Sequence, residues 1–275
     1  MLITAKPAAP LARFVHVLWV VDRRAEPHTS GCELVLPTGA MHIVLSLSGE
    51  PFRIGNGETA LASTALVGGA RSRPYLRHRA GPLLSAGALL RPGAGPFVLG
   101  CSAAALAERH TPLENILGAA ARTGLERVAS APDSRAALRR FEQLLVSRLT
   151  APRGMHPAVA HALERFALGE HIGEVVRRTG YSHRRFIALF EPTVGLTPKR
   201  YCRVHRFGRA LARLCTEPGA GMACIAQESG YSDQAHFSRE FRALGGISPA
   251  AYRRLGPSRP HHLPAHAASL PDATP

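Results

Sequence analysis

Two stretches of the chain repeat each other: GYSHRRFIALF at residues 180–190 and GYSDQAHFSREF at residues 230–241. In both copies a Gly follows the second Phe after five residues, a Pro comes three later, and a Tyr three after that. The offset between the copies is 50 residues up to the Ser and 51 beyond it, so one residue is inserted after the second Ser. A repeat this short indicates one supersecondary unit that is used twice.

The first copy is typical of two helices joined by a tight turn. Apolar positions predict a short helix over Ile172–Arg178, which ends at Gly180 because glycine adopts the left-handed conformation that often follows a helix. Ser182 is placed to cap a second helix over residues 183–190, whose phenylalanines pack back on the first helix. We expect Pro192 to end this second helix early.

The second copy predicts the same unit, with helices over residues 222–228 and 233–244, a turn at Gly230 and a cap at Ser232. Two short helices around a glycine-containing turn indicate a helix-turn-helix, whose second helix enters the major groove of DNA. The alternative for each unit alone is a small helical hairpin without a role in DNA binding.

A long helix joins the two units. Thr197-Pro198 predicts its start, with a cap followed by proline in the first turn, and we expect it to run to about Cys215, roughly 28 Å. Reading helices at its two ends would lie near the ~34 Å repeat of the DNA helix. Its basic residues, which we expect on exposed positions, are Lys199, Arg200, Arg203, Arg206, Arg209 and Arg213. A solvated charged face is the alternative for some of them.

Charge and composition support a polyanionic partner. The 275 residues include 34 Lys+Arg against 19 Asp+Glu, a net charge of +15. Only two of the basic residues are lysines, and arginine suits forked hydrogen bonds to phosphate and guanine, although a GC-rich genome also favours arginine. The five cysteines form no C-x-x-C pair, and no secretion signal or membrane-length apolar run is visible, so we expect a cytoplasmic protein without a membrane partner.

The N-terminal part reads differently. Glycine and proline interrupt residues 11–92, and the runs between them predict strands at residues 14–21, 33–36, 42–47, 65–67, 75–79 and 83–90, typical of a small β-sandwich or barrel. Residues 95–150 have a helical pattern, with an apolar stripe through Leu138, Phe141, Leu145 and Leu149 that either packs on its own domain or forms a dimerisation helix.

These patterns predict an α+β chain in three parts. Residues 1–150 form a β-rich sensory or dimerisation domain with C-terminal helices, and residues 151–256 form an all-α domain of two helix-turn-helix units joined by a long helix. A linker is expected at residues 151–154. Residues 257–275, rich in proline, histidine and alanine, are expected to be disordered.

Three segments of the sequence resemble a known family. The run IAxxxGYSDQxxFSRxFR at residues 225–242, followed by GISPxxYR at 246–253, resembles the signature of AraC/XylS-type DNA-binding domains. VLPTG at residues 35–39 and RPG at 91–93 are similar to the cupin-like sensory domain of one subgroup. The resemblance implies a bacterial transcription regulator that binds double-stranded DNA, with RNA polymerase, a small-molecule effector and a second copy of the chain as further partners. It does not distinguish an activator from a repressor.

In the second unit, the resemblance assigns base contacts to Gln234, Ala235 and Arg239, with His236 and Ser238 beside them. Glutamine pairs with adenine and arginine with guanine through two hydrogen bonds, each pair contributing roughly 1–3 kcal/mol of discrimination.

In the first unit, the matching positions are Arg184, Ile187 and Ala188, with His183 and Arg185 adjacent. Ile187 and Ala188 can contact only a thymine methyl group. Either the two arginines therefore carry the base recognition, or this unit mainly holds phosphate.

Further contacts are predicted by charge. We expect phosphate contacts from Lys199, Arg200, Arg203, Arg242 and Arg253. In the β-rich part, Arg71, Arg73, Arg77 and Arg79 recur with period two and would share one strand face, which either receives an anionic effector or is simply solvated.

Two other classes of protein are alternatives to a transcription regulator. A metal-dependent cupin enzyme or an alkyl-transfer repair enzyme fused to DNA-binding helices would need clustered ligands or an activated thiol. The candidates are scattered: His16, His28, His42, His78, Cys32 and Cys101. We therefore expect no catalytic residue, cofactor or metal. An architectural DNA-coating protein is the third hypothesis, and it would leave the β-rich half without a role.

Overall fold

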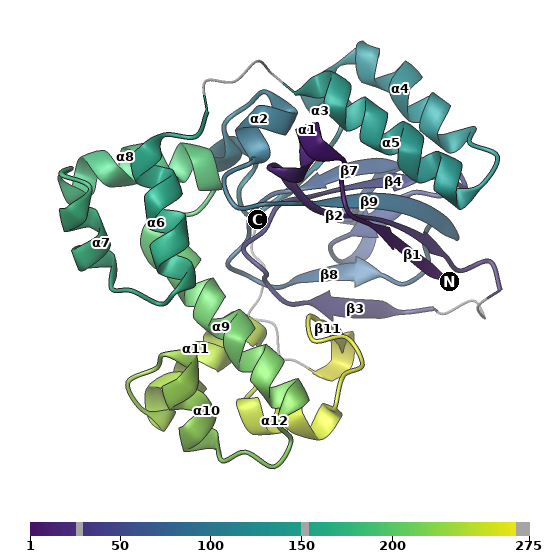
Figure 1. The fold of residues 1–275 in the computed structure, drawn as a ribbon. Helices are drawn as coiled ribbons and strands as arrows, with labels where there is room; N and C mark the ends of the chain where they lie inside the picture. Colours follow the sequence, from purple (N-terminus) through teal and green to yellow (C-terminus); the bar gives the residue numbers. More distant parts are fainter. Residues whose placement is uncertain (26–29, 150–153, 268–275) are drawn as a thin grey trace.

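The computed structural model describes residues 1–25, 30–149 and 154–267. Figure 1 shows a β-rich half covered by helices and a helical half, with the long helix α9 running along the latter. Among the described residues, no helix is both long and apolar enough to cross a membrane.

Two antiparallel sheets form the β-rich half. The first sheet has the strand order β1-β2-β9-β4-β7-β10 and consists of Leu2–Ala5, Val15–Asp22, Leu84–Leu90, His42–Ser46, Ala65–Gly68 and His110–Pro112. The second has the order β11-β3-β8-β5-β6 and consists of His262–Pro264, Cys32–Val35, Tyr75–His78, Phe52–Ile54 and Leu61–Ser63. The predicted α+β class with a β-sandwich is therefore confirmed.

Helices cover the outer face of the first sheet. They are α1 (Ala9–Ala12), α2 (Gly95–Leu99), α3 (Glu114–Leu117), α4 (Ala119–Ala129) and α5 (Ser134–Arg148). This half also has 3-10 turns at Gly57–Thr59, between β5 and β6, and at Ala103–Leu106. Leu18 and Ile43 of this sheet face share a buried core with Phe141 of α5. The apolar stripe of α5 thus packs on its own domain, which was one of the two predicted alternatives.

Glycines open space on the inner face of the first sheet, between the two sheets. Gly68 lies opposite both His42 and His110, and a Cβ at Gly68 would stand 2.1 Å from Cε1 of His42. The two imidazole centroids are 5.7 Å apart as a result. Gly87 lies opposite Trp19 in the same way, with the indole ring over it.

Six predicted strands are present as β2, β3, β4, β7, β8 and β9, each within about two residues of its expected ends. The strands β1, β5, β6, β10 and β11 were missed. They are three or four residues long, too short for an alternating pattern.

The helical half follows the predicted order. Its helices are α6 (Pro157–Ala167), α7 (Ile172–Arg178), α8 (His183–Val194), α9 (Pro198–Thr216), α10 (Met222–Ser229), α11 (Gln234–Gly245) and α12 (Pro249–Leu255). We call α7 with α8 the first unit and α10 with α11 the second unit.

The helix caps explain the changed offset between the copies. Ser182 accepts from the backbone N–H of Arg185 at 3.3 Å and caps α8 as predicted. In the second unit the cap is Asp233, which accepts from the N–H of His236 at 2.7 Å, so the prediction of Ser232 was wrong. The inserted residue has taken over the capping position.

Pro192 does not end α8, contrary to expectation, because the helix continues to Val194. Proline removes one backbone hydrogen bond, to the carbonyl of Ala188. Ala188 lies on the exposed side of the helix, where water can serve that carbonyl. Gly195 then ends the helix with a φ of 90°.

Two expectations concern the edges of the helical half. The expected disorder of residues 257–275 is wrong for His262–Pro264, which form strand β11 against β3. Residues 268–275 lie outside the described residues, and so does most of the expected linker, residues 151–153.

The paired imidazoles predict a pH dependence of stability. Burial, aided by the charges of Arg77 and Arg71, lowers the pKa of His42 to about 4, and burial lowers that of His110 to about 2. Below about pH 6.5 the unfolded chain therefore binds protons at His42 and His110, whereas both imidazoles stay neutral in the folded state until the pH is much lower. We expect the free energy of unfolding to fall as the pH drops from 6.5 to 4, by up to about 1 kcal/mol per pH unit for His42.

Urea unfolding between pH 7 and pH 5 measures this slope. His42→Gln should flatten it, whereas His16→Gln, at an exposed position of β2, should leave it as in the wild type. An unchanged slope in His42→Gln would contradict the assignment.

Candidate nucleic-acid interface

The first unit exposes one face of α8 and buries the other. Phe186 and Phe190 are fully buried, and Phe190 packs edge-on against Phe166 and Tyr201, with ring centroids 5.8 and 5.7 Å apart. The five residues predicted for DNA contact all lie on the exposed face: His183, Arg184, Arg185, Ile187 and Ala188. Ile187 is 38% exposed, so this face also presents an apolar side chain beside the polar ones.

The second unit repeats this arrangement on α11. Phe237 and Phe241 are fully buried, and Phe241 packs against Phe207 of α9 with ring centroids 4.9 Å apart. The predicted reading residues Gln234, Ala235 and Arg239 are exposed.

The two neighbouring residues, His236 and Ser238, are half-buried. Nδ1 of His236 lies 3.0 Å from the hydroxyl oxygen of Ser232, and its ring stands edge-on to Tyr231. His236 is thus held by its own unit, which orients its ring but limits its reach toward a base.

The basic side of α9 differs from expectation. Lys199 and Arg200 are exposed as predicted, but the prediction of exposed positions is wrong for Arg203, Arg206, Arg209 and Arg213. These four are half-buried because they hold the second unit together.

Each of the four arginines has a partner in the second unit or beside it. Arg203 and Arg206 donate to Glu240 of α11 at 2.6 and 3.3 Å. Arg209 donates to the carbonyl of Ser229 at 3.1 Å. Arg213 pairs with Glu217 at 2.8 Å and with Glu228.

The predicted phosphate contacts therefore separate into two groups. Lys199, Arg200 and Arg242 have exposed side chains that are free to reach a duplex. Arg253 is half-buried and donates weakly to the sulfur of Met222 at 3.6 Å, and Arg203 is paired with Glu240. A phosphate role for these two arginines stays a prediction.

The four predicted effector arginines do not share one strand face. Only Arg77 lies within β8, and Arg71 precedes it, while Arg73 and Arg79 are exposed outside the strand. The strand is shorter than the period-two pattern suggested, because Pro74 stands directly before it.

Arg71 and Arg77 instead join the paired imidazoles. Nη1 of Arg71 lies 3.3 Å from Nδ1 of His110, and its guanidinium stacks over the ring of Tyr75 at 4.9 Å. Burial lowers the pKa of Arg71, and its Nε has no hydrogen-bond partner among the described atoms. Nearby, Glu108 accepts from Ser72 and adopts a φ of 60°, a strained value for a residue other than glycine.

Arg77 is held by an acidic neighbour. It forms an ion pair with Glu33 of β3, and Nδ1 of His262 in β11 lies 3.3 Å from the same carboxylate. Burial favours the neutral form of Glu33, but His262 and Arg77 outweigh it and hold its pKa at about 2. We call Arg71, Tyr75, Arg77, His42 and His110 the charged cluster.

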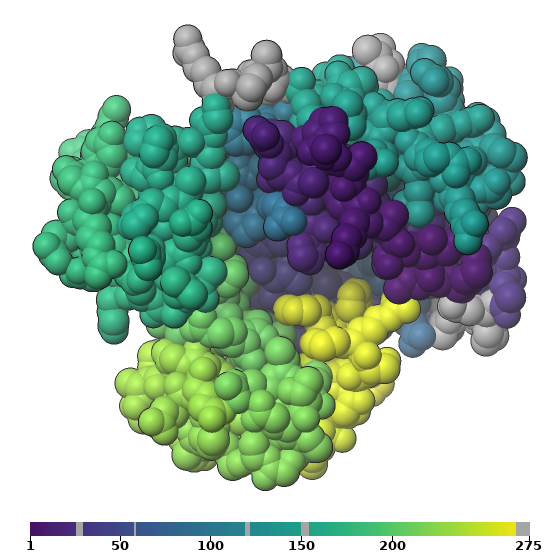
Figure 2. Space-filling view, in the orientation of Figure 1, coloured from purple at the N-terminus to yellow at the C-terminus, as the bar shows by residue number. Residues whose placement is uncertain are grey.

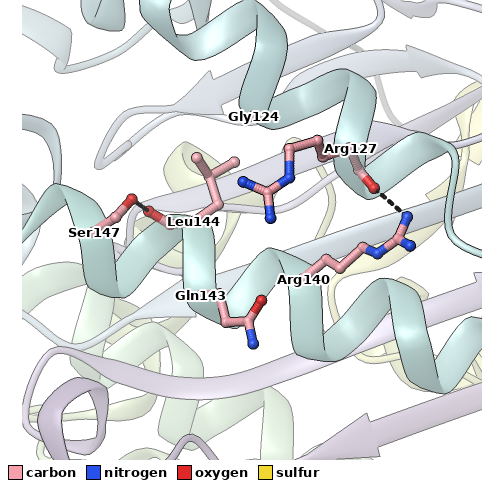
Figure 3. Close-up of a pocket in the computed structure, with 6 residues that line it drawn as sticks. All are labelled: Gly124, Arg127, Arg140, Gln143, Leu144 and Ser147. Atoms are coloured by element: carbon pink, nitrogen blue, oxygen red, sulfur yellow. Dashed lines mark hydrogen bonds between the residues drawn. The ribbon is translucent and has the colours of Figure 1, made fainter.

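A separate groove lies between α4 and α5, and none of the predicted site residues lines it (Figure 3). Its volume is about 260 Å³, and Gly124, Arg127, Arg140, Gln143, Leu144 and Ser147 line it. Arg140 donates to the carbonyl of Arg127 at 2.7 Å, which ties the two helices together beside the groove.

The alternative enzyme sites gain no support from the described residues. Within these residues no group of three or more His, Cys, Asp or Glu is arranged to hold a metal ion. Burial raises the pKa of Cys101, the opposite of what an activated thiol requires. His28 lies outside the described residues.

Three residues of these sites had no prediction from the sequence: Glu240, Glu33 and His110. Glu240 and Glu33 lie far in sequence from the arginines that they hold, so no local pattern marks them. The Gly68-Gly69 pair was a usable signal for His110, since glycine inside a strand often marks a close approach of another group.

Comparisons with known proteins agree with this geometry. Residues 175–255, from α7 to the end of α12, match the family described as "Helix-turn-helix domain", and residues 3–112 match a "Domain of unknown function (DUF6597)".

Two curated relatives match part of the chain. An uncharacterized HTH-type transcriptional regulator of Haemophilus influenzae is 31% identical over 84 residues, covering 30% of this chain and 28% of the relative. The probable transcriptional regulator LumQ of Photobacterium leiognathi is 38% identical over 69 residues, covering 25% and 27%. The matched stretch thus spans less than a third of either relative.

Among solved structures, ToxT of Vibrio cholerae has a TM-score of 0.45 at 9% identity and covers 94% of this chain and 99% of its own. The C-terminal domain of AraT, a response regulator of Geobacillus stearothermophilus, has a TM-score of 0.35 at 22% identity and covers 38% and 88%. Residues 175–255 thus form a helix-turn-helix domain, in agreement with the resemblance of this region to AraC/XylS-type DNA-binding domains.

Proposed function

We propose that this protein is a sequence-specific DNA-binding transcription regulator whose two helix-turn-helix units read successive major grooves on one side of the duplex. One observation carries the proposal: both reading faces are exposed, and a single 19-residue helix, α9, joins the two units. At 1.5 Å per residue that helix is roughly 28 Å long, close to one turn of B-form DNA.

The two units differ in what they offer to DNA. Gln234 and Arg239 of the second unit present groups that pair with adenine and guanine. In the first unit Arg184 and Arg185 supply the polar groups, and Ile187 offers apolar contact to a thymine methyl. We infer that the second unit supplies most of the base discrimination, while Lys199, Arg200 and Arg242 hold the backbone.

Selection of bound sequences from a random duplex pool tests this function. We expect one preferred site with two conserved segments about 10 base pairs apart, because the proposal has the two units enter successive major grooves on one side of the duplex. Footprinting on that site should then protect two major-groove segments. Equal affinity for the selected site and for bulk DNA at moderate salt would contradict the proposal.

Two arginines on α11 make a matched pair for a second test. Arg239→Ala should weaken binding to the selected site by roughly 1–3 kcal/mol and relax the preference at one base pair, because it removes a base contact. Arg242→Ala should weaken all sequences about equally and lower the salt dependence, because it removes a phosphate contact. Filter binding at three salt concentrations distinguishes these outcomes, and identical effects of both variants would refute the assignment.

We further propose that the β-rich half modulates DNA binding by taking an anionic effector at the charged cluster. Two guanidinium groups, the neutral imidazole pair and the aromatic ring of Tyr75 meet there. The unpartnered Nε of Arg71 supports the idea, since buried polar groups in proteins are normally hydrogen-bonded. Arg73 and Arg79 are not part of this proposal because they lie outside the cluster.

The only tryptophan of the chain, Trp19, lies on the same inner face and provides a signal. We expect benzoate, used as an aromatic carboxylate probe, to change the Trp19 fluorescence saturably in the wild type. Arg71→Ala should abolish the change, and Arg73→Ala should not. Equal titrations of both variants would speak against the cluster as the effector site.

The remaining expectations follow from this function and are part of the proposal. A regulator of this kind works at the chromosome, so we propose a cytoplasmic location, with RNA polymerase and a second copy of the chain as candidate partners. We propose a regulatory rather than an enzymatic role.

A further inference from the structure

The C-terminal segment of the chain returns to the β-rich half. Strand β11 pairs with β3 in antiparallel register, with Leu263 opposite Leu34, and the N–H of Leu36 donates to the carbonyl of His261 at 2.8 Å. Figure 2 shows this segment in yellow, between the second unit and the β-rich half. The helical half is thus followed by a strand that belongs to the second sheet of the β-rich half.

The strand β3 presents different residues to its two sides. Leu34 and Leu36 are 0% and 1% exposed, and with Leu263 they share one apolar core with Phe207 and Tyr252 of the helical half. Because side chains alternate along a strand, Glu33 points to the opposite side, where it meets Arg77 and His262. One strand therefore contacts the second unit on one side and the charged cluster on the other.

Further contacts attach the paired strands β3 and β11 to the helices. The hydroxyl of Tyr252 in α12 donates to the carbonyl of Pro260 at 2.8 Å, just before β11. In the loop that follows β3, a Cβ at Gly39 would lie 3.2 Å from Cγ1 of Val204 in α9. The second unit is held on the sheet by β11, by Leu34 of β3 with Leu36 just after it, and by this loop.

The first unit is attached to the same half at another place. The hydroxyl of Ser102 donates to the carbonyl of Pro192 in α8 at 3.3 Å. A Cβ at Gly195 would lie 3.0 Å from Cβ of Ala70 and 3.2 Å from the carbonyl oxygen of Ala103. The β-rich half therefore contacts both units and bridges them, while both reading faces stay exposed.

We propose that β11 is a latch. When it is paired with β3, it holds the second unit on the β-rich half. The β-rich half, which also contacts the first unit, then keeps the two units in one arrangement. Opening the latch leaves α9 as the connection between the two units. The closed form favours simultaneous contact with two grooves because less freedom is lost on binding.

The inference rests on the proposed DNA-binding function and describes how that function is regulated. Glu33 belongs to β3, and its partner Arg77 belongs to the charged cluster, so an occupant of the cluster acts on DNA affinity through this strand. The latch is thus the physical link between the effector side of the sheet and the DNA side.

Leu263→Ala removes the apolar contacts of the latch with the core around Leu34. His262→Ala removes its polar contact with Glu33 and carries less risk to folding, because His262 is only half-buried. His266→Ala, an exposed histidine in the following turn at Ala265–Ala267, is the matched control. Amide hydrogen exchange of the full-length variants measures the opening. Two duplexes, one with both selected segments and one with only the segment bound by the second unit, measure the DNA affinity.

We expect faster exchange at Leu36 and β11 in both opening variants but not in the control. The affinity for the two-segment duplex should fall by roughly three- to tenfold, and that for the one-segment duplex should stay within about twofold, because only the bracing is lost. Wild-type affinity ratios in both opening variants, or unchanged exchange at Leu36, would overturn the latch. Absence of any sequence preference in the wild type would instead refute the proposed function.

Discussion

A single helix is shared by two hydrophobic cores, and the rest of the helical half depends on it. Tyr201, near the start of α9, is buried in the core of the first unit against Phe166 and Phe190. Phe207, Leu211 and Leu214, further along, are buried in the core of the second. Because both ends of the apolar stripe are buried, α9 cannot rotate about its axis without exposing one core. This constraint limits how far the two reading helices turn relative to each other, and the contacts of both units with the β-rich half limit bending between them.

Electrostatics supports the same rigidity. The arginines of α9 were expected to face DNA, yet four of them bind groups within the protein, and Glu240 alone receives two. A half-buried carboxylate between two guanidinium groups orients α11 against α9. The exposed basic side chains of these helices therefore lie at the start of α9 and on the exposed faces of α8 and α11. Net charge alone would not have located them.

The repeated helical elements could be predicted because each has local signals. The bounds of α7 and the start of α9 follow from apolar spacing, a turn glycine and a Thr-Pro pair, and the exposure of Arg184 and Arg239 follows from the helical period. Strand β11 could not be predicted, since Leu263 stands between a histidine and a proline and its partner Leu34 lies at the other end of the chain. The pairing of Arg203 with Glu240 was hidden for the same reason. The Asp233 cap was within reach, because the offset between the copies changes at that residue.

The central claim is that α9 sets the two reading heads at a fixed spacing. The affinity of the wild-type protein for its selected duplex, compared with duplexes in which about 5 or about 10 base pairs are inserted between the two segments, tests it directly. A rigid connection predicts that both insertions reduce the affinity to that of a duplex carrying one segment. Full affinity after the 10-base-pair insertion, which restores the same face of the helix at twice the distance, would contradict the account.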